Sequence, residues 1–253
     1  IKYNMMKLIN HENIHFDYII IGGGMGGMYA AEKLYEKYGS SKKIALFDDR
    51  TYFGGRLLTH QNPHYEIGGA RFHDNHILLN KLIDKYNMEK YKLSNKVDFI
   101  YKRGDKIKFF KDAATTFRQI MNNIIKLSNK VLKKDLQSMT LKQFIDKVSN
   151  GFALSKRLIH IFGYYSEICE MNAYDSLSSM KNDFLSNDFY ILKKGFSKLF
   201  HKMYNKNKGN IYYNLNCSVK NVKRINGHFL CEIENVKYNN KFEIHGNNVI
   251  FAL

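Results

Sequence analysis

Hydrophobic and polar positions in the first part of the chain follow a strand, turn, helix, strand order. An apolar run over residues 16–21 meets a cluster of glycines, and residues 28–38 then repeat apolar positions at helical spacing up to Gly39. A second apolar run covers residues 43–47. Short apolar runs separated by a helical segment are typical of parallel strands joined by a crossover helix, so this stretch predicts a β-α-β unit.

Helical patterns dominate the middle of the chain. Apolar residues recur every three or four positions in three stretches, which predicts helices, and Asp74 or Asn75 is expected to cap the first of them. These stretches cover residues 74–86, 112–127 and 140–148. Apolar and aromatic residues at helical spacing continue over residues 151–180. We therefore expect this region to be mainly α-helical.

Strand-like patterns occur in two further regions. Residues 97–100 and 107–110 flank a glycine turn and predict a β-hairpin. After Gly209 four strands are expected, the first two joined by a tight turn at Asn226-Gly227. These four strands cover residues 218–224, 228–233, 241–244 and 248–253. Residues 1–15 are expected to form a loose lead-in and residues 49–63 a long loop.

The glycine cluster at the first turn carries the strongest chemical signal. Gly22, Gly24 and Gly27 fit the pattern G-x-G-x-x-G. The first glycine permits the turn, the second lets a pyrophosphate approach the backbone, and the third lets helix and strand pack. The N–H groups at the helix start would hold the phosphates. Asp48 follows the next strand, about 20 positions after Gly27, where an acid accepts hydrogen bonds from a ribose. The spacing predicts a dinucleotide site.

Two further motifs follow this acid. Gly54-Gly55-Arg56 is succeeded by Thr59, and Glu66-Ile67-Gly68-Gly69-Ala70-Arg71-Phe72 comes next. Together they are far more specific than the fingerprint alone, because glycine-rich turns are common and many bind nothing. Their order resembles that of the FAD-dependent amine oxidases, a family that includes monoamine, polyamine and L-amino-acid oxidases. One departure is Asp48, since the family usually has Glu at this place.

The resemblance implies a role for each motif. Asp48 would bind the adenosine ribose, while Arg50 and Arg56 would lie along the adenosine and the pyrophosphate. Residues 69–72 would border the isoalloxazine ring, and the backbone of Val219 would contact the adenine. The complete set of predicted FAD-binding residues is Gly22, Gly24, Met25, Gly26, Gly27, Asp48, Asp49, Arg50, Gly54, Gly55, Arg56, Gly69, Ala70, Arg71, Phe72 and Val219.

The resemblance also implies a fold and a domain order. The fold class is α/β, with a Rossmann-like, glutathione-reductase-like FAD-binding domain and an inserted, mainly helical substrate domain. The expected division is a tail at 1–15, the FAD-binding domain at 16–100, the substrate domain at 101–208 and a β-meander at 209–253. Family members continue beyond such a meander with a catalytic lysine and an aromatic cage, which implies that this chain is an N-terminal portion. No catalytic residue is therefore assigned.

The overall charge suggests other partners. The chain has 40 Lys and Arg against 23 Asp and Glu, a net charge of +17. Such a balance is compatible with nucleic acid or an anionic membrane surface. The lysines are scattered and fall mostly on helix faces expected to be solvated, so we expect no nucleic-acid partner. No apolar run approaches the roughly 20 residues that span a bilayer, so no membrane span is expected either.

Cysteine and histidine residues give no metal signature. Cys169, Cys217 and Cys231 are far apart and form no C-x-x-C pair, so neither a disulfide framework nor a zinc site is expected. His73 and His76 lack a nearby third ligand, and we interpret them as local polar groups. We expect a soluble protein in the cytoplasm or another reducing compartment.

The function that the resemblance implies is FAD-dependent oxidation of a small-molecule amine, with hydride transfer from a C–N bond to flavin and reoxidation by oxygen. One alternative is a catalytically inactive flavin-binding or interaction module. Another is a related desaturase or protoporphyrinogen-type oxidase. NAD could replace FAD at the fingerprint, but the motifs after residue 53 favour FAD, because a pure NAD domain has no flavin ring to border. The sequence leaves the substrate and the oligomeric state open.

Overall fold

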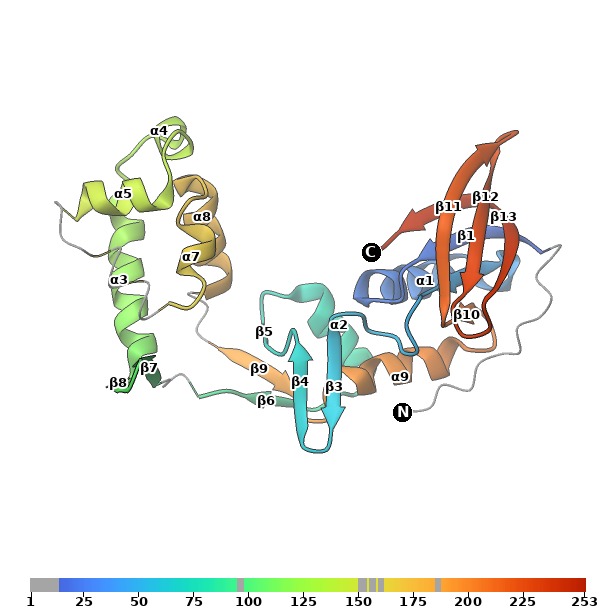
Figure 1. Ribbon diagram of the computed structural model, residues 1–253, viewed down its shortest axis with the longest axis horizontal. Helices are drawn as coiled ribbons and strands as arrows, with labels where there is room; N and C mark the ends of the chain where they lie inside the picture. The colour runs from blue at the N-terminus through green and yellow to red at the C-terminus, as the bar shows by residue number, and fades with distance from the viewer. Residues whose placement is uncertain (1–13, 95–97, 150–153, 155–157, 159–161, 185–187) are drawn as a thin grey trace. The chain divides into compact units, whose positions relative to one another are not determined.

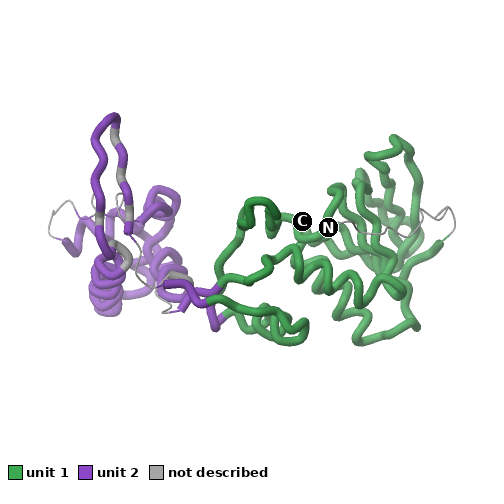
Figure 2. Tube along the Cα trace, turned by 90° about the horizontal axis from the view of Figure 1, so that it is seen from below, with its two compact units in different colours: residues 1–72, 76–91, 191–253 green, residues 73–75, 92–190 purple. Residues whose placement is uncertain are grey.

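The computed structural model describes residues 14–94, 98–149, 154, 158, 162–184 and 188–253. The chain divides into two compact units (Figure 2). Unit 1 consists of Ile1–Phe72, His76–Tyr91 and Ile191–Leu253, and unit 2 consists of His73–Asn75 and Lys92–Tyr190. The boundary falls within three short strands, β5 (Phe72–His73), β6 (Lys90–Lys92) and β9 (Phe189–Leu192).

In the described part of unit 1, six strands form one sheet in the order β10-β2-β1-β13-β12-β11 (Figure 1). The first four are parallel to one another, and β12 and β11 continue the sheet antiparallel. The strands are β1 (His15–Ile21), β2 (Ile44–Phe47), β10 (Tyr212–Asn214), β11 (Cys217–Ile225), β12 (His228–Asn235) and β13 (Asn240–Phe251). This parallel sheet confirms the predicted α/β class and Rossmann-like fold.

The first β-α-β unit has the elements that the pattern predicts. All four residues of β2 are buried, as are Phe16 and Ile19 of β1, which is why both strands are continuous apolar runs. Helix α1 (Met25–Tyr38) connects them and is followed by the short turn η1 (Gly39–Ser41). It begins three residues earlier than apolar spacing indicates, because its first turn contains two glycines that carry no hydrophobic signal.

Two strand predictions are wrong in extent. The runs at 241–244 and 248–253 belong to the single strand β13, which continues through Gly246. Its first half pairs antiparallel with β12 and its second half parallel with β1. A Cβ atom at Gly246 would lie 2.6 Å from Cδ1 of Ile19, so this glycine is needed for strand packing and does not mark a turn.

The loop predicted at 49–63 is also wrong in its second half. Residues from Leu57 onward form an antiparallel hairpin of β3 (Leu57–Gln61) and β4 (His64–Gly68). Only the third position of β3 is buried. The apolar alternation that identifies a half-buried strand is therefore weak here, which explains why the sequence did not predict β3.

Helices α2 (Ile77–Lys85) and α9 (Phe196–Asn207) complete unit 1. The N-cap of α2 is His76, and no side chain caps this end of the helix, so the predicted capping by Asp74 or Asn75 is wrong. The helix is fixed instead at its C-terminal end. Lys85 pairs with the carboxylate of Glu32, which lies on α1 and is 1% exposed, and the Tyr86 hydroxyl donates to the same carboxylate at 2.6 Å. Burial raises the pKa of Tyr86 to about 12, so this donor keeps its proton.

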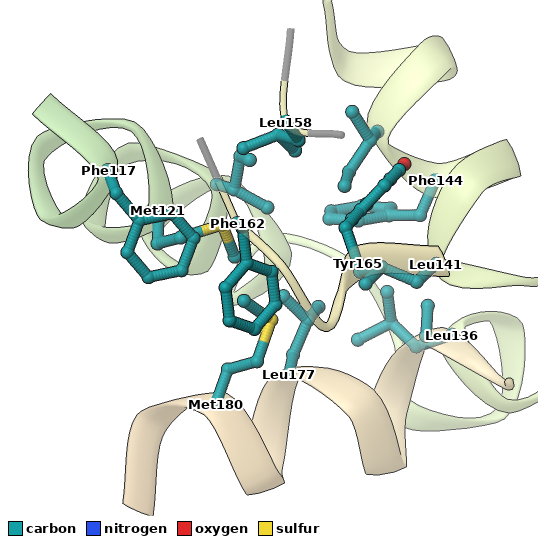
Figure 3. Close-up of a cluster of buried hydrophobic side chains, with 13 residues drawn as sticks. Phe117, Met121, Leu136, Leu141, Phe144, Leu158, Phe162, Tyr165, Leu177 and Met180 are labelled. Carbon is teal, nitrogen blue, oxygen red and sulfur yellow. The ribbon is translucent and has the colours of Figure 1, made fainter. Parts of the chain in front are cut away.

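Unit 2 has a core of its own (Figure 3). Among its described residues are a hairpin and several helices, namely β7 (Phe99–Arg103), β8 (Lys106–Phe110), α3 (Ala113–Ser128), α4 (Lys133–Gln137), α5 (Leu141–Val148), α7 (Tyr165–Ile168), α8 (Ala173–Ser179) and the π-helical η2 (Met180–Phe184). Phe117 and Phe162 stack with ring centroids 4.6 Å apart. Thr140 begins α5, as predicted, in a capping box with Gln143. Parts of the predicted helical stretch 151–180 lie outside the described residues.

The cysteines and histidines of the described residues form no metal cluster, since no group of three His, Cys, Asp or Glu could hold an ion there. Cys217 and Cys231 are buried, and burial raises the pKa of both thiols to about 11. Every helix in the same part of the chain is too short or too polar to cross a bilayer.

Tyr86→Phe tests the buried carboxylate. The change removes one hydrogen-bond donor to Glu32 without changing the ring, and we expect it to lower the free energy of unfolding by about 1–3 kcal/mol. Urea unfolding followed by circular dichroism measures this. Tyr238→Phe is the matched control, because Tyr238 is 58% exposed, and it should change stability by less than about 0.5 kcal/mol. Equal effects of both substitutions would contradict a structural role for the Tyr86 hydroxyl.

Candidate dinucleotide-binding site

The glycine-rich turn joins the end of β1 to the start of α1. Gly22 has a φ of +108°, and its N–H donates to the carbonyl of Phe47 at 2.8 Å. A Cβ atom at Gly27 would lie 1.8 Å from the carbonyl oxygen of Gly22, and one at Gly22 would lie 2.4 Å from that of Ala252. The first and third glycines of the fingerprint are therefore required by the packing of the protein itself.

Gly24 differs from its neighbours. It is the N-cap of α1 with an ordinary φ of −70°, and a Cβ atom there would meet nothing within 4 Å. No side chain caps this end of α1, and its first turn contains no acidic residue. The N-terminus of a helix attracts anions through its N–H groups and dipole. The arrangement suits a phosphate that approaches the backbone at Gly24, beside Met25 and Gly26.

Asp48 follows β2 and holds the glycine-rich turn. Its Oδ2 accepts a hydrogen bond from the N–H of Gly23 at 2.6 Å, and its Oδ1 accepts one from the N–H of Arg50 at 2.8 Å. A carboxylate offers about four acceptor positions, so both oxygens can still accept from a ribose. The short Asp side chain reaches the backbone of the turn directly. Asp48 therefore has a positioning role that its place in the motif does not reveal.

The segment Gly54-Gly55-Arg56 packs against the same turn. The N–H of Gly54 donates to the carbonyl of Gly23 at 2.9 Å, and a Cβ atom at Gly55 would lie 3.4 Å from Cα of Gly24. Arg56 is exposed. Two motifs that are about 30 residues apart in the sequence thus form one surface, with a cation at its edge.

The second predicted segment lies next to Arg56. The N–H of Gly69 donates to the carbonyl of Arg56 at 3.3 Å, and Gly68, with a φ of +110°, packs on the same carbonyl group. Ala70 is half-buried and Arg71 is exposed. Phe72 is completely buried, and its ring meets that of Phe196 at a centroid distance of 6.2 Å. The side chain of Phe72 therefore belongs to the core of unit 1.

The remaining predicted residues surround Asp48. Asp49 and Arg50 are exposed, and the Arg50 guanidinium donates to the hydroxyl of Tyr52 at 2.7 Å. The N–H of Cys217, at the start of β11, donates to the carbonyl of Asp48 at 2.8 Å. This bond brings β11, and with it Val219, against the turn that follows β2. The predicted contact of Val219 with adenine stays a prediction.

Comparison with known proteins agrees with this geometry. The family model of the NAD(P)-binding Rossmann-like domain matches residues 20–86, which include the glycine-rich turn, Asp48 and both later motifs. Putrescine oxidase bound to putrescine superimposes with a TM-score of 0.69 at 17% identity, over 95% of this chain and 58% of that chain. Cyclohexylamine oxidase from Brevibacterium oxydans gives a TM-score of 0.64 at 14% identity, with the same two coverages.

The chain contains an NAD(P)-binding Rossmann-like domain and shares its fold with these two amine oxidases. Among curated relatives, human prenylcysteine oxidase 1 is 31% identical over 135 residues, which are 53% of this chain and 25% of that protein. Sulfide-quinone reductase of Aquifex aeolicus is 38% identical over 71 residues, which are 28% of this chain and 16% of that protein. The chain thus spans about a quarter of the length of the prenylcysteine oxidases that it matches.

Three residues gain a role only from the structure. Thr59, Glu66 and Ser197 come from β3, β4 and the first turn of α9, and hydrogen bonds connect all three. Thr59 and Glu66 stand in the family motifs, but no sequence pattern pairs them with Ser197, which follows Thr59 by 138 positions.

Gly27→Ala and Gly26→Ala test the packing of the turn. In the absence of ligand, we expect Gly27→Ala to destabilise the fold by about 3 kcal/mol or more, because its methyl group would overlap the carbonyl of Gly22. A Cβ atom at Gly26 would come no closer than 3.9 Å to Cβ of Ala252. Gly26→Ala is therefore the control, neutral or stabilising by up to about 1 kcal/mol. Chemical denaturation of both variants measures their free energies of unfolding, and a Gly27→Ala protein as stable as the wild type would refute the packing role.

Proposed function

We propose that this chain is the dinucleotide-binding part of an FAD-dependent oxidoreductase that oxidises the C–N bond of a small amine. One observation carries the proposal: the start of α1, Asp48 and the Gly54–Arg56 segment converge where β1 and β2 end. In open parallel sheets, ligands bind outside the carboxyl ends of the strands. The site thus combines an anion-binding helix start with a ribose acceptor.

The residues present fit FAD. The start of α1 at Gly24 would hold the pyrophosphate, and Asp48 would accept hydrogen bonds from the adenosine ribose. Arg56 would lie along the pyrophosphate, and the adjoining Gly69 and Ala70 would border the isoalloxazine ring. The bond between Gly69 and Arg56 supports this order, because it links the phosphate side of the site to the flavin side. A domain that binds only NAD would have no flavin ring for Gly69 and Ala70 to border.

Amine oxidation is supported by the solved structures that share this fold. Putrescine oxidase and cyclohexylamine oxidase are both named for amine substrates. When bound, FAD supplies the hydride acceptor. The described residues of this chain bind and orient the cofactor, and we assign a catalytic role to none of them. We assign unit 2, which overlaps most of the predicted segment 101–208, the role of the substrate domain because it has its own packed core.

Titration with FAD tests the proposed function. We expect quenching of flavin fluorescence with a single-site isotherm, and weaker or no binding of riboflavin and NAD. Riboflavin lacks the adenosine and the pyrophosphate, so it separates contacts to the ring from contacts to the phosphates. Binding of NAD more tightly than FAD, or no binding of FAD, would refute the proposal.

Gly24→Ala separates ligand binding from folding. The structure has room for the added methyl group, so the thermal midpoint of the ligand-free protein should stay unchanged. A phosphate at the backbone would meet that methyl group, and we expect the FAD dissociation constant to rise more than about tenfold. Gly209→Ala is the control, since a Cβ atom there also meets nothing within 4 Å and Gly209 lies just after α9. Unchanged FAD affinity in Gly24→Ala would place the phosphates elsewhere.

A further inference from the structure

Helix α9 packs against the predicted cofactor-binding segments, although it follows them by more than a hundred residues in the sequence. Phe196, Phe200 and Tyr204 recur every four residues and therefore share one face of the helix. Phe200 packs on Gly54, where a Cβ atom would lie 2.7 Å from its ring. Tyr204 stacks on Phe53 at a centroid distance of 5.8 Å. Phe196 contacts Phe72, so the same helix face also supports the end of the predicted cofactor-binding segment 69–72.

Three hydrogen bonds join the first turn of α9 to the β3–β4 hairpin, and a fourth connects the two strands of the hairpin at the same place. The N–H of Thr59 donates to Oγ of Ser197 at 2.9 Å, and the N–H of Ser197 donates back to Oγ1 of Thr59 at 3.0 Å. Oε1 of Glu66 accepts from the Thr59 hydroxyl at 3.0 Å and from the N–H of Phe196 at 2.9 Å. We call Thr59, Glu66 and Ser197 the hairpin clamp. Thr59 and Ser197 are buried, so water cannot replace the bonds that they make.

The hairpin clamp caps a helix that cannot cap itself. The first N–H groups of a helix have no partner within the helix. The N-cap of α9 is Gly195, which has no side chain to accept from them. A side chain would not fit there, because Gly195 has a φ of +70° and its Cβ atom would lie 2.3 Å from Oγ1 of Thr59. Thr59 and Glu66 therefore supply the cap from the hairpin, and the negative carboxylate also suits the helix dipole.

We propose that the hairpin clamp positions the cofactor, an inference that rests on the proposed function. Thr59 follows Arg56 by three residues, and Glu66 precedes Gly69 by three. Fixing β3 and β4 on α9 therefore fixes both the phosphate-side Arg56 and the flavin-side Gly69. Thr59, Glu66 and Ser197 are positioning residues in this account, since they act through the hairpin and not on the ligand.

Substitutions at Thr59 test the hairpin clamp. Thr59→Val keeps the shape of the side chain but removes the hydroxyl, and we expect its FAD dissociation constant to rise about tenfold, with a weaker visible circular dichroism of the bound flavin. Thr59→Ser restores the hydroxyl and should restore both signals. Thr116→Val, at an exposed position of α3, is the matched control and should bind FAD as the wild type does.

Hydrogen exchange of the ligand-free protein gives an independent measurement. The amides of the hairpin, and that of Gly69 just after it, should exchange faster in Thr59→Val and in Ser197→Ala than in the wild type, because each substitution removes part of the hydrogen bonding that holds the hairpin on α9. If the amides exchange faster but FAD affinity and visible circular dichroism are unchanged, the hairpin clamp serves stability alone and the proposal is overturned. Unchanged exchange would also overturn it.

Failure of the proposed function would look different. A wild-type chain that binds no FAD would refute the proposed function and remove the ligand on which the positioning role depends. A wild type that binds FAD, with a Thr59→Val variant that binds it equally well, would refute the hairpin clamp alone.

Discussion

The structure depends on the close approach of α1 to β1 at the glycine-rich turn. The carbonyl of Gly22 occupies the space where a side chain of Gly27 would be, so helix and strand meet backbone to backbone. This approach aims the start of α1 across the carboxyl end of the sheet. Asp48 then reaches the N–H of Gly23 from β2, and Gly54 reaches its carbonyl from the next segment. The candidate site is assembled from backbone groups that only a glycine-rich turn exposes.

Three different reasons for glycine are combined in this small region. Gly27 is required by packing, and Gly22, Gly68 and Gly195 are required by packing and also by backbone angles that other residues rarely adopt. Gly24 is required by neither, which agrees with the proposed approach of a phosphate to its backbone. A motif that reads as one pattern in the sequence thus contains positions with separable roles.

The sequence predicted the first β-α-β unit, the helix that begins at Thr140 and the hairpin at Asn226, because each has a local signal in periodicity or turn chemistry. It could not predict the continuous strand β13, since Gly246, which interrupts the apolar pattern between residues 244 and 248, is needed for close packing against Ile19 of another strand. It likewise could not pair Thr59 with Ser197. Relations of this kind depend on which distant segments meet, and a single sequence does not record them.

The position of β13 in the sheet has a consequence for folding. Its partner β1 lies more than two hundred residues earlier in the sequence, and His15 pairs with His245 in register. The centre of the sheet therefore closes only after a loop of more than two hundred residues has been brought together, a contact of very high sequence separation. During synthesis β1 has to wait until more than two hundred further residues have emerged. Until then the unpaired backbone N–H and C=O groups along one edge of β1 are open to incorrect pairing.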